Sequence, residues 1–252
     1  MFFDTHAHYD DDRFDGDRDE LLMSMKGTVD LIVNPGCNMP TSLKAVEIAE
    51  KYPFVYAGIG FHPHDSKEMT SHSLSALEKL SHNPRVVAIG EIGLDYHYDN
   101  SPRKIQQECF REQLELARKL SLPVIIHERE ASRDCLDIIR DFRDILGVFH
   151  CYSGSVESAK TIIKQGWYLS FTGVVTYKNA KKSREVIKWM PQDKLMIETD
   201  APYLSPETVR GQRNSSLHLP LIAQAVADIL DSNVAEVAEL TMNNGKRFFG
   251  IN

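Results

Sequence analysis

The sequence alternates short apolar runs with segments of helical length, and this repetition is the feature that most limits the fold. Most runs are nearly continuous in apolar residues, as expected for parallel strands that are buried on both faces. They recur roughly every 20–40 residues, a spacing typical of successive βα units. The eight runs lie at residues 2–4, 30–33, 55–59, 86–89, 124–126, 148–149, 168–171 and 195–197.

Helix boundaries are marked in several of the intervening segments. Ser101 and Pro102 suit the N-cap and first position of a long amphipathic helix that ends near Ser121. Asn233 suits the N-cap of a final helix that reaches about Phe249. Strands and helices therefore alternate along the whole chain.

Eight strands in 252 residues predict an α/β fold, a (β/α)8 TIM barrel. We expect residues 1–252 to form a single domain, because no linker or low-complexity segment interrupts the alternation. A doubly wound open sheet is the alternative. Its glycine fingerprint is missing, since Gly58 and Gly60 are not followed by a third glycine and a helix start.

The composition, 42% hydrophobic and 26% charged, is ordinary for a soluble globular protein. No apolar stretch approaches the roughly 20 residues that span a bilayer. The N-terminus lacks a signal-peptide pattern, and the scattered cysteines form no CxxC pair, which favours reduced thiols in a cytoplasmic protein. No obligate protein partner is evident. The net charge of −7 excludes a global positive field that would attract nucleic acid. The cysteines are Cys37, Cys109, Cys135 and Cys151.

Residues of the types that bind metals lie just past the apolar runs. In a strand, alternate side chains point to one face, so the His-x-His after the first run directs two imidazoles to one spot. The carboxyl ends of barrel strands carry the active sites of such folds, so ligands from distant parts of the chain converge there. The six candidates are His6, His8, Glu91, His127, His150 and Asp200.

Four histidines and two carboxylates exceed one tetrahedral site, which favours two divalent metal ions bridged by a carboxylate. Glu91 lies midway among the strands and is the natural bridge. Mixed nitrogen and oxygen ligands suit Zn²⁺, Mn²⁺ or Mg²⁺, so the metal stays open. We expect one ion on His6, His8, Glu91 and Asp200, and the other on Glu91, His127 and His150.

Seven motifs occur in order over nearly the whole chain. They are DTHAH at 4–8, GFHPH at 60–64, GEIGLDY at 90–96, HCYSG at 150–154, ETDAPYL at 198–204, RGQRN at 210–214 and NGKRFF at 244–249. Together they resemble the TatD family of metal-dependent deoxyribonucleases, within the wider amidohydrolase-like barrel superfamily. Two segments depart from the family pattern: Ser215-Ser216 stands where Glu-Pro is common, and Gly245 where Ala is frequent. Neither departure touches a ligand candidate.

The resemblance implies a binuclear hydrolase that cleaves phosphodiester bonds in DNA, acting as an exonuclease on single strands or frayed ends. It also permits D-aminoacyl-tRNA deacylation. Another metal-dependent ester or amide hydrolase is a further alternative. Many such barrels bridge their metals with a carboxylated lysine, whereas by resemblance Glu91 stands at the corresponding position of this chain. A non-catalytic nucleic-acid-binding barrel would be favoured by a missing ligand, and none is missing.

Three residues are candidates for catalysis. Asp200 could bind a metal ion and accept a proton from the attacking water; a helix cap is its structural alternative. Glu198 shares the face of Asp200 and could orient the water or a ligand histidine. His62 has no metal position of its own, and the resemblance agrees with a proton donor or a contact to the scissile phosphate.

Phosphate contacts are expected from the loops after the last two strands. Arg210 and Arg213 follow the eighth strand, and a guanidinium matches phosphate geometry. A basic segment follows the seventh strand, although a solvated helix face explains it equally well. That segment contains Lys178, Lys181, Lys182, Arg184 and Lys188.

Overall fold

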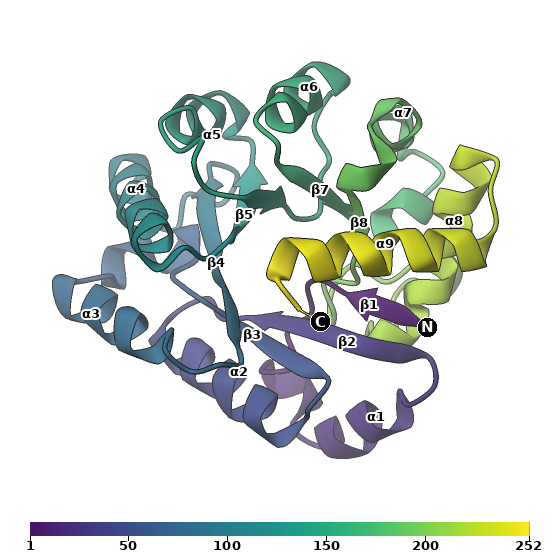
Figure 1. Cartoon of the computed structure of the whole chain (residues 1–252), viewed down its shortest axis with the longest axis horizontal. Helices are drawn as coiled ribbons and strands as arrows, with labels where there is room; N and C mark the ends of the chain where they lie inside the picture. Colours follow the sequence, from purple (N-terminus) through teal and green to yellow (C-terminus); the bar gives the residue numbers. More distant parts are fainter. Residues whose placement is uncertain (252) are drawn as a thin grey trace.

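Eight parallel strands, paired in chain order, form a nearly closed barrel in the computed structural model, which describes residues 1–251 (Figure 1). The predicted TIM barrel is confirmed, and the open doubly wound sheet is excluded by this strand order. The strands are β1 (Phe2–Asp4), β2 (Val29–Pro35), β3 (Val55–Ile59), β4 (Val86–Asp95), β5 (Val124–Arg129), β6 (Gly147–Phe149), β7 (Tyr168–Phe171) and β8 (Leu195–Ile197).

Backbone contacts between the segments that follow β1 and β8 close the barrel. Ala7 and Ala201 form an isolated parallel bridge. The amide of Asp200 donates to the carbonyl of His6 at 2.9 Å, and the amide of His8 donates to the carbonyl of Ala201 at 2.7 Å. This closure brings the first and last ligand candidates of the chain together.

All helices except the last form an outer ring around the strands (Figure 1). No helix within residues 1–251 is both long and apolar enough to cross a membrane. The helices are α1 (Arg18–Ser24), α2 (Met39–Lys51), α3 (Ser71–Leu80), α4 (Arg103–Leu120), α5 (Ser132–Ile139), α6 (Val156–Lys164), α7 (Lys181–Trp189), α8 (Leu219–Leu230) and α9 (Val234–Phe249).

The expected boundaries of α9 are confirmed: the side chain of Asn233 caps its start, and the helix ends at Phe249. The expected cap of α4 is wrong. This helix begins at Arg103, one residue late, with Pro102 in the cap position and no side-chain cap. The hydroxyl of Ser101 is engaged elsewhere, because it donates to the carbonyl of His64 at 2.8 Å.

Strand β4 is longer than the apolar run at 86–89 indicates. Gly90 ends that run and Gly93 interrupts the residues after it, but the chain continues as a strand to Asp95. This part of the strand pairs with β5 after a shift in register. Glu91 therefore lies within β4 rather than just past it. The register shift falls between Ile89 and Ile92, on either side of this glutamate.

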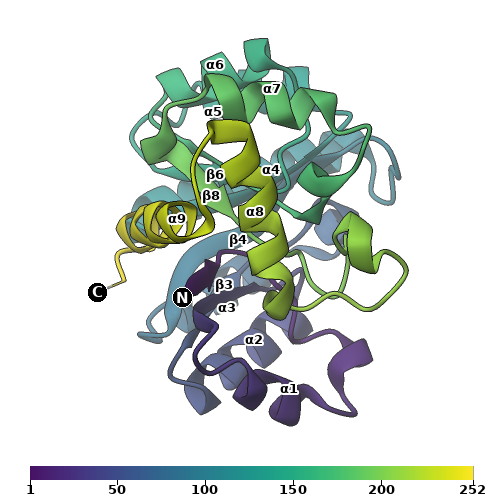
Figure 2. The same cartoon turned by 90° about the vertical axis from the view of Figure 1, so that its right-hand side faces the viewer.

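Helix α9 covers the end of the barrel opposite the carboxyl ends of the strands (Figures 1 and 2). Its aromatic side chains belong to a buried cluster with side chains from most of the strands. The ring centroid of Phe249 lies 5.8 Å from that of Phe3 in β1, and that of Phe248 lies 5.1 Å from that of Tyr168 in β7. This end of the barrel is therefore filled with packed side chains.

The departure at Gly245 has a packing reason. A Cβ atom at this position of α9 would lie 2.6 Å from Cδ1 of Phe3 and 3.3 Å from Cγ2 of Thr5. The first distance is below any normal contact, so the phenyl ring occupies the space that an alanine side chain would need. Helix and strand approach closely here because the residue is glycine.

We expect Gly245→Ala to lower the free energy of unfolding. Alanine in a helix gains about 1 kcal/mol over glycine, but overpacking a core typically costs about 1–3 kcal/mol. In a Phe3→Val background the same change should be neutral or stabilising, because valine has no δ carbon at the place of the contact. Urea unfolding of the two single variants and the double variant measures the coupling. Equal losses in both backgrounds would show that Phe3 does not restrict this position.

Candidate metal centre

The six ligand candidates meet at the carboxyl ends of five strands. His6 and His8 follow β1, Glu91 lies in β4, and His127 lies in β5. His150 directly follows β6, and Asp200 lies three residues past β8. His6 is fully buried and Glu91 is 3% exposed, so the cluster lies at the bottom of the barrel mouth.

One group of ligand atoms forms around the first two histidines. The Nε2 atoms of His6 and His8 lie 3.0 Å apart. Oε2 of Glu91 is 3.4 Å from Nε2 of His6 and 3.5 Å from Nε2 of His8. Oδ1 of Asp200 is 3.6 Å from both nitrogens. Two imidazole nitrogens and two carboxylate oxygens thus surround one point, a donor set that fits a divalent cation.

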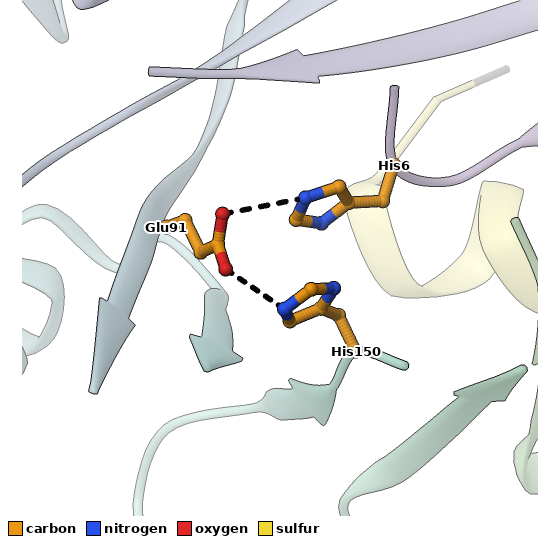
Figure 3. Close-up of side chains that lie close together, drawn as sticks. All are labelled: His6, Glu91 and His150. Carbon is orange, nitrogen blue, oxygen red and sulfur yellow. Dashed lines mark ion pairs between the residues drawn. The ribbon is translucent and has the colours of Figure 1, made fainter. Parts of the chain in front are cut away.

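A second group uses the other oxygen of the same glutamate. Oε1 of Glu91 lies 2.8 Å from Nδ1 of His127 and 2.8 Å from Nε2 of His150. Those two nitrogens are 3.3 Å apart. Figure 3 shows the carboxylate of Glu91 with one oxygen toward His6 and the other toward His150. The six residues expected from the sequence lie together, while their division between two ions and their binding of metal stay predictions.

The histidines of the cluster stabilise the negative charges of its two carboxylates. Burial alone would raise the pKa of Glu91, but the surrounding histidines hold it well below its usual range. The pKa of Asp200 is lowered as well, because His8 and His6 outweigh burial. Both carboxylates are therefore ionised, as ligands of a cation must be.

Asp95 supports the second group from outside. Its Oδ2 atom lies 3.1 Å from Nε2 of His127 and 3.0 Å from Nε2 of His64. A carboxylate on the distal nitrogen fixes the tautomer and orientation of a ligand histidine. In the sequence, Asp95 belongs to the GEIGLDY motif, and from the sequence alone it is only a weak candidate for the rim of the site. The available signal is strand periodicity, because Asp95 lies four residues after Glu91 in one strand and shares its face.

Glu198 lies behind His150 rather than in the centre. Oε1 of Glu198 accepts a hydrogen bond from the amide of Cys151 at 2.6 Å and lies 3.5 Å from Nδ1 of His150. Thr5 donates to its other oxygen. This geometry favours a positioning role toward a ligand histidine over contact with the attacking water.

His62 points at the second group. Its Nε2 atom lies 3.6 Å from Oε1 of Glu91, and its ring centroid is 4.4 Å from that of His127. The amide of His64 donates to Nδ1 of His62 at 3.2 Å. In the neutral ring the proton therefore sits on Nε2, which faces the cluster as a donor. His62 also has a ligand atom within 4.8 Å of ligand atoms of Glu91 and His127, so its exclusion from metal binding stays a prediction.

Two cysteines lie near the cluster. Sγ of Cys37 is within 4.8 Å of ligand atoms of His8 and Glu91, a neighbour that the sequence pattern does not reveal because it follows a glycine after β2. Cys151 belongs to none of the candidate ligand groups within residues 1–251, and its thiol lies 3.5 Å from the hydroxyl of Thr172.

The rim loop after β8 is tied to β1 by a serine at the departure from the family pattern. The hydroxyl of Ser216 donates to Oδ2 of Asp4 at 2.6 Å, and its amide donates to the hydroxyl of Tyr9 at 2.9 Å. A proline at this position could not donate the second bond. Burial raises the pKa of Asp4 to about 7, although hydrogen bonds from Ser216 and Thr199 oppose the shift.

The two arginines of the rim are held away from the cluster. Arg213 forms an ion pair with Asp17, with Nη1 2.8 Å from Oδ1. The guanidinium of Arg210 lies 4.8 Å from the ring centroid of Tyr177. Neither arginine has a hydrogen bond or ion pair to the ligand groups within residues 1–251. Their contact with phosphate stays a prediction, and the ion pair of Arg213 favours a structural role.

Known proteins are similar to this chain in sequence and in fold. A family model described as TatD related DNase matches residues 3–250. The chain belongs to the TatD family. It is 44% identical over 255 residues to a Bacillus subtilis protein described as the uncharacterized metal-dependent hydrolase YabD, with 100% of each chain covered.

Two further TatD relatives extend the comparison. The 3'-5' ssDNA/RNA exonuclease TatD of Escherichia fergusonii is 33% identical over 257 residues, with 99% of each chain covered. The crystal structure of the TatD homologue YjjV from Escherichia coli K12 matches with a TM-score of 0.92 at 30% identity, and the match covers 100% of this chain and 98% of that one. The chain is therefore a TatD-family metal-dependent hydrolase, and the expected family is confirmed.

We expect Asp95→Asn to weaken one of two metal-binding steps by about 10–100-fold, because an amide orients His127 less well. Calorimetric titration with Mn²⁺ resolves the two steps. Asp134→Asn is the matched control: its carboxylate accepts from the hydroxyl of Tyr96 at 2.7 Å and touches no ligand histidine. Unchanged affinity in the Asp95 variant would remove Asp95 from the support of the second group.

Proposed function

We propose that this TatD-family protein hydrolyses phosphodiester bonds at the ends of single-stranded DNA with two divalent metal ions. The observation that carries the proposal is the position of Glu91, whose two oxygens face two separate sets of ligands. One set is His6, His8 and Asp200, and the other is His127 and His150. Two cations about 3.5–4 Å apart suit the in-line displacement of a phosphodiester.

The substrate class is supported by the relative from Escherichia fergusonii, which is described as a 3'-5' ssDNA/RNA exonuclease and matches along its whole length. A bridging glutamate also suits the nuclease branch of the barrel hydrolases better than the ester and amide hydrolases that bridge their metals with a carboxylated lysine. We therefore place single-stranded DNA ahead of aminoacyl-tRNA and small amides as the substrate.

The bound metal ions would lower the pKa of water and offset charge on the phosphate oxygens. The protein supplies the rest. Asp200 is ionised, faces the first group and can accept the proton of the attacking water. Burial lowers the pKa of His62 well below its usual value, so its neutral ring presents an N–H to a phosphate or leaving oxygen. Glu198, with Oε1 3.5 Å from Nδ1 of His150, would keep that ring in position.

The metal-loaded protein should shorten a single-stranded oligonucleotide from its ends. Asp200→Asn keeps the size and one ligating oxygen but loses the basicity, so turnover should fall by about 10²–10⁴-fold. Affinity for the oligonucleotide should change little. A D-aminoacyl-tRNA is assayed beside it with the same two proteins. Cleavage of the ester with no loss of oligonucleotide would replace the nuclease proposal with the deacylase.

His62→Ala should lose turnover and keep both ions. Nδ1 of His62 accepts the amide of His64, so a metal on Nε2 would require the loss of the only proton of the ring. Elemental analysis after dialysis against metal gives the ion count, and initial rates give the turnover. His72→Ala, on the exposed start of α3, is the control and should change neither quantity. A His62 variant that holds one ion fewer would make His62 a ligand of the second group.

A further inference from the structure

An exposed aromatic ring lies beside the second ligand group, and an arginine covers it. Tyr98 comes three residues after the end of β4 and is 54% exposed. Arg129 is the last residue of β5, two positions past His127, so both leave the strand on one face. The guanidinium carbon of Arg129 lies 4.7 Å from the centroid of the Tyr98 ring.

Tyr98 is anchored to the same carboxylate that orients the ligand histidine. Its amide donates to Oδ1 of Asp95 at 2.9 Å, while Oδ2 of Asp95 contacts His127. The ring of His64 stands between this tyrosine and the cluster, with its centroid 5.3 Å from that of Tyr98 and 4.3 Å from that of His62. The aromatic surface is therefore continuous with the candidate site and fixed relative to it.

Arg129 has no carboxylate partner among residues 1–251, in contrast to another arginine that stacks on an exposed tyrosine. Arg13 covers the ring of Tyr203 at 4.0 Å, but its charge is offset by two hydrogen bonds of 2.9 Å to Asp11. The protein has a net charge of −7, so a guanidinium without a carboxylate partner at the mouth of the site can attract an anionic group of a bound molecule.

We propose that Tyr98 and Arg129 bind one nucleotide of a single-stranded nucleic acid beside the second ligand group. The base stacks on the part of the Tyr98 ring that Arg129 leaves exposed, and a phosphate contacts the guanidinium. Proteins that bind single strands without sequence preference combine these two elements, since every base has a π face and every linkage a charge. This proposal rests on the proposed nuclease function.

Kinetics on oligothymidylate at several salt concentrations test the arginine in the metal-loaded enzyme. Arg129→Ala should raise KM and make the salt dependence of log(kcat/KM) shallower by about 0.7, the value for one phosphate on a single strand. The control is Arg143→Ala. Arg143 is exposed, has no carboxylate partner within residues 1–251, and lies between α5 and β6, at the opposite end of the barrel. Equal slopes in the two variants would overturn the phosphate contact.

The tyrosine is tested by removing the base instead of the charge. Tyr98→Ala should raise KM on oligothymidylate by about tenfold, and Tyr98→Phe should keep the normal value. On a strand of the same length whose terminal residues are abasic, wild type and Tyr98→Ala should have equal KM. A Tyr98→Ala penalty of the same size on both strands would overturn stacking. If the wild type leaves oligothymidylate intact, the nuclease function and this proposal both fail. If the wild type is active but the variants at Tyr98 and Arg129 have unchanged kinetics, only this proposal fails.

Discussion

A buried carboxylate between two sets of histidines is the constraint on which the site depends. Glu91 is 3% exposed, and its charge is balanced only by groups that lie within hydrogen-bonding or ionic distance. A buried charge is costly unless it is paired, and the surrounding histidines together stabilise the ionised form of this carboxylate. Two cations would satisfy both of its oxygens at once.

The barrel makes this arrangement possible because packed side chains fill one end and the candidate site occupies the other. Helix α9 and the aromatic cluster around Phe3 fill one end of the barrel, so that end contributes to stability. The other end carries the ligand candidates, and the backbone bridge between Ala7 and Ala201 joins the segments that follow the first and last strands there. Asp95 contacts His127, and Glu198 lies 3.5 Å from His150, both from outside the cluster. Glu91, Asp95 and His127 lie within strands, and the other ligand candidates lie within four residues of a strand end.

Much of this was predictable because buried parallel strands have a strong sequence signal. The apolar runs located all eight strands, and the polar residues that follow them identified the cluster. The continuation of β4 to Asp95 was missed because Gly90 and Gly93 interrupt the apolar pattern, although the backbone still pairs with β5. That omission also hid the role of Asp95, which depends on the face it shares with Glu91.

Contacts between distant segments could not be predicted from local pattern. The ion pair of Arg213 with Asp17 joins a rim loop to the start of α1, and nothing near either residue in the sequence indicates it. The closeness of Tyr98 and Arg129 likewise requires β4 and β5 to be neighbours in a known register. In both cases the side-chain types were visible, but their partners are set by the tertiary fold.

The bridging position of Glu91 is the central claim, and anomalous diffraction from crystals grown with Mn²⁺ tests it most directly. The account predicts two peaks roughly 3.5–4 Å apart, one between His6, His8 and Asp200 and the other between His127 and His150, with one oxygen of Glu91 on each. A single peak at saturating metal, or both oxygens of Glu91 on one ion, would contradict it.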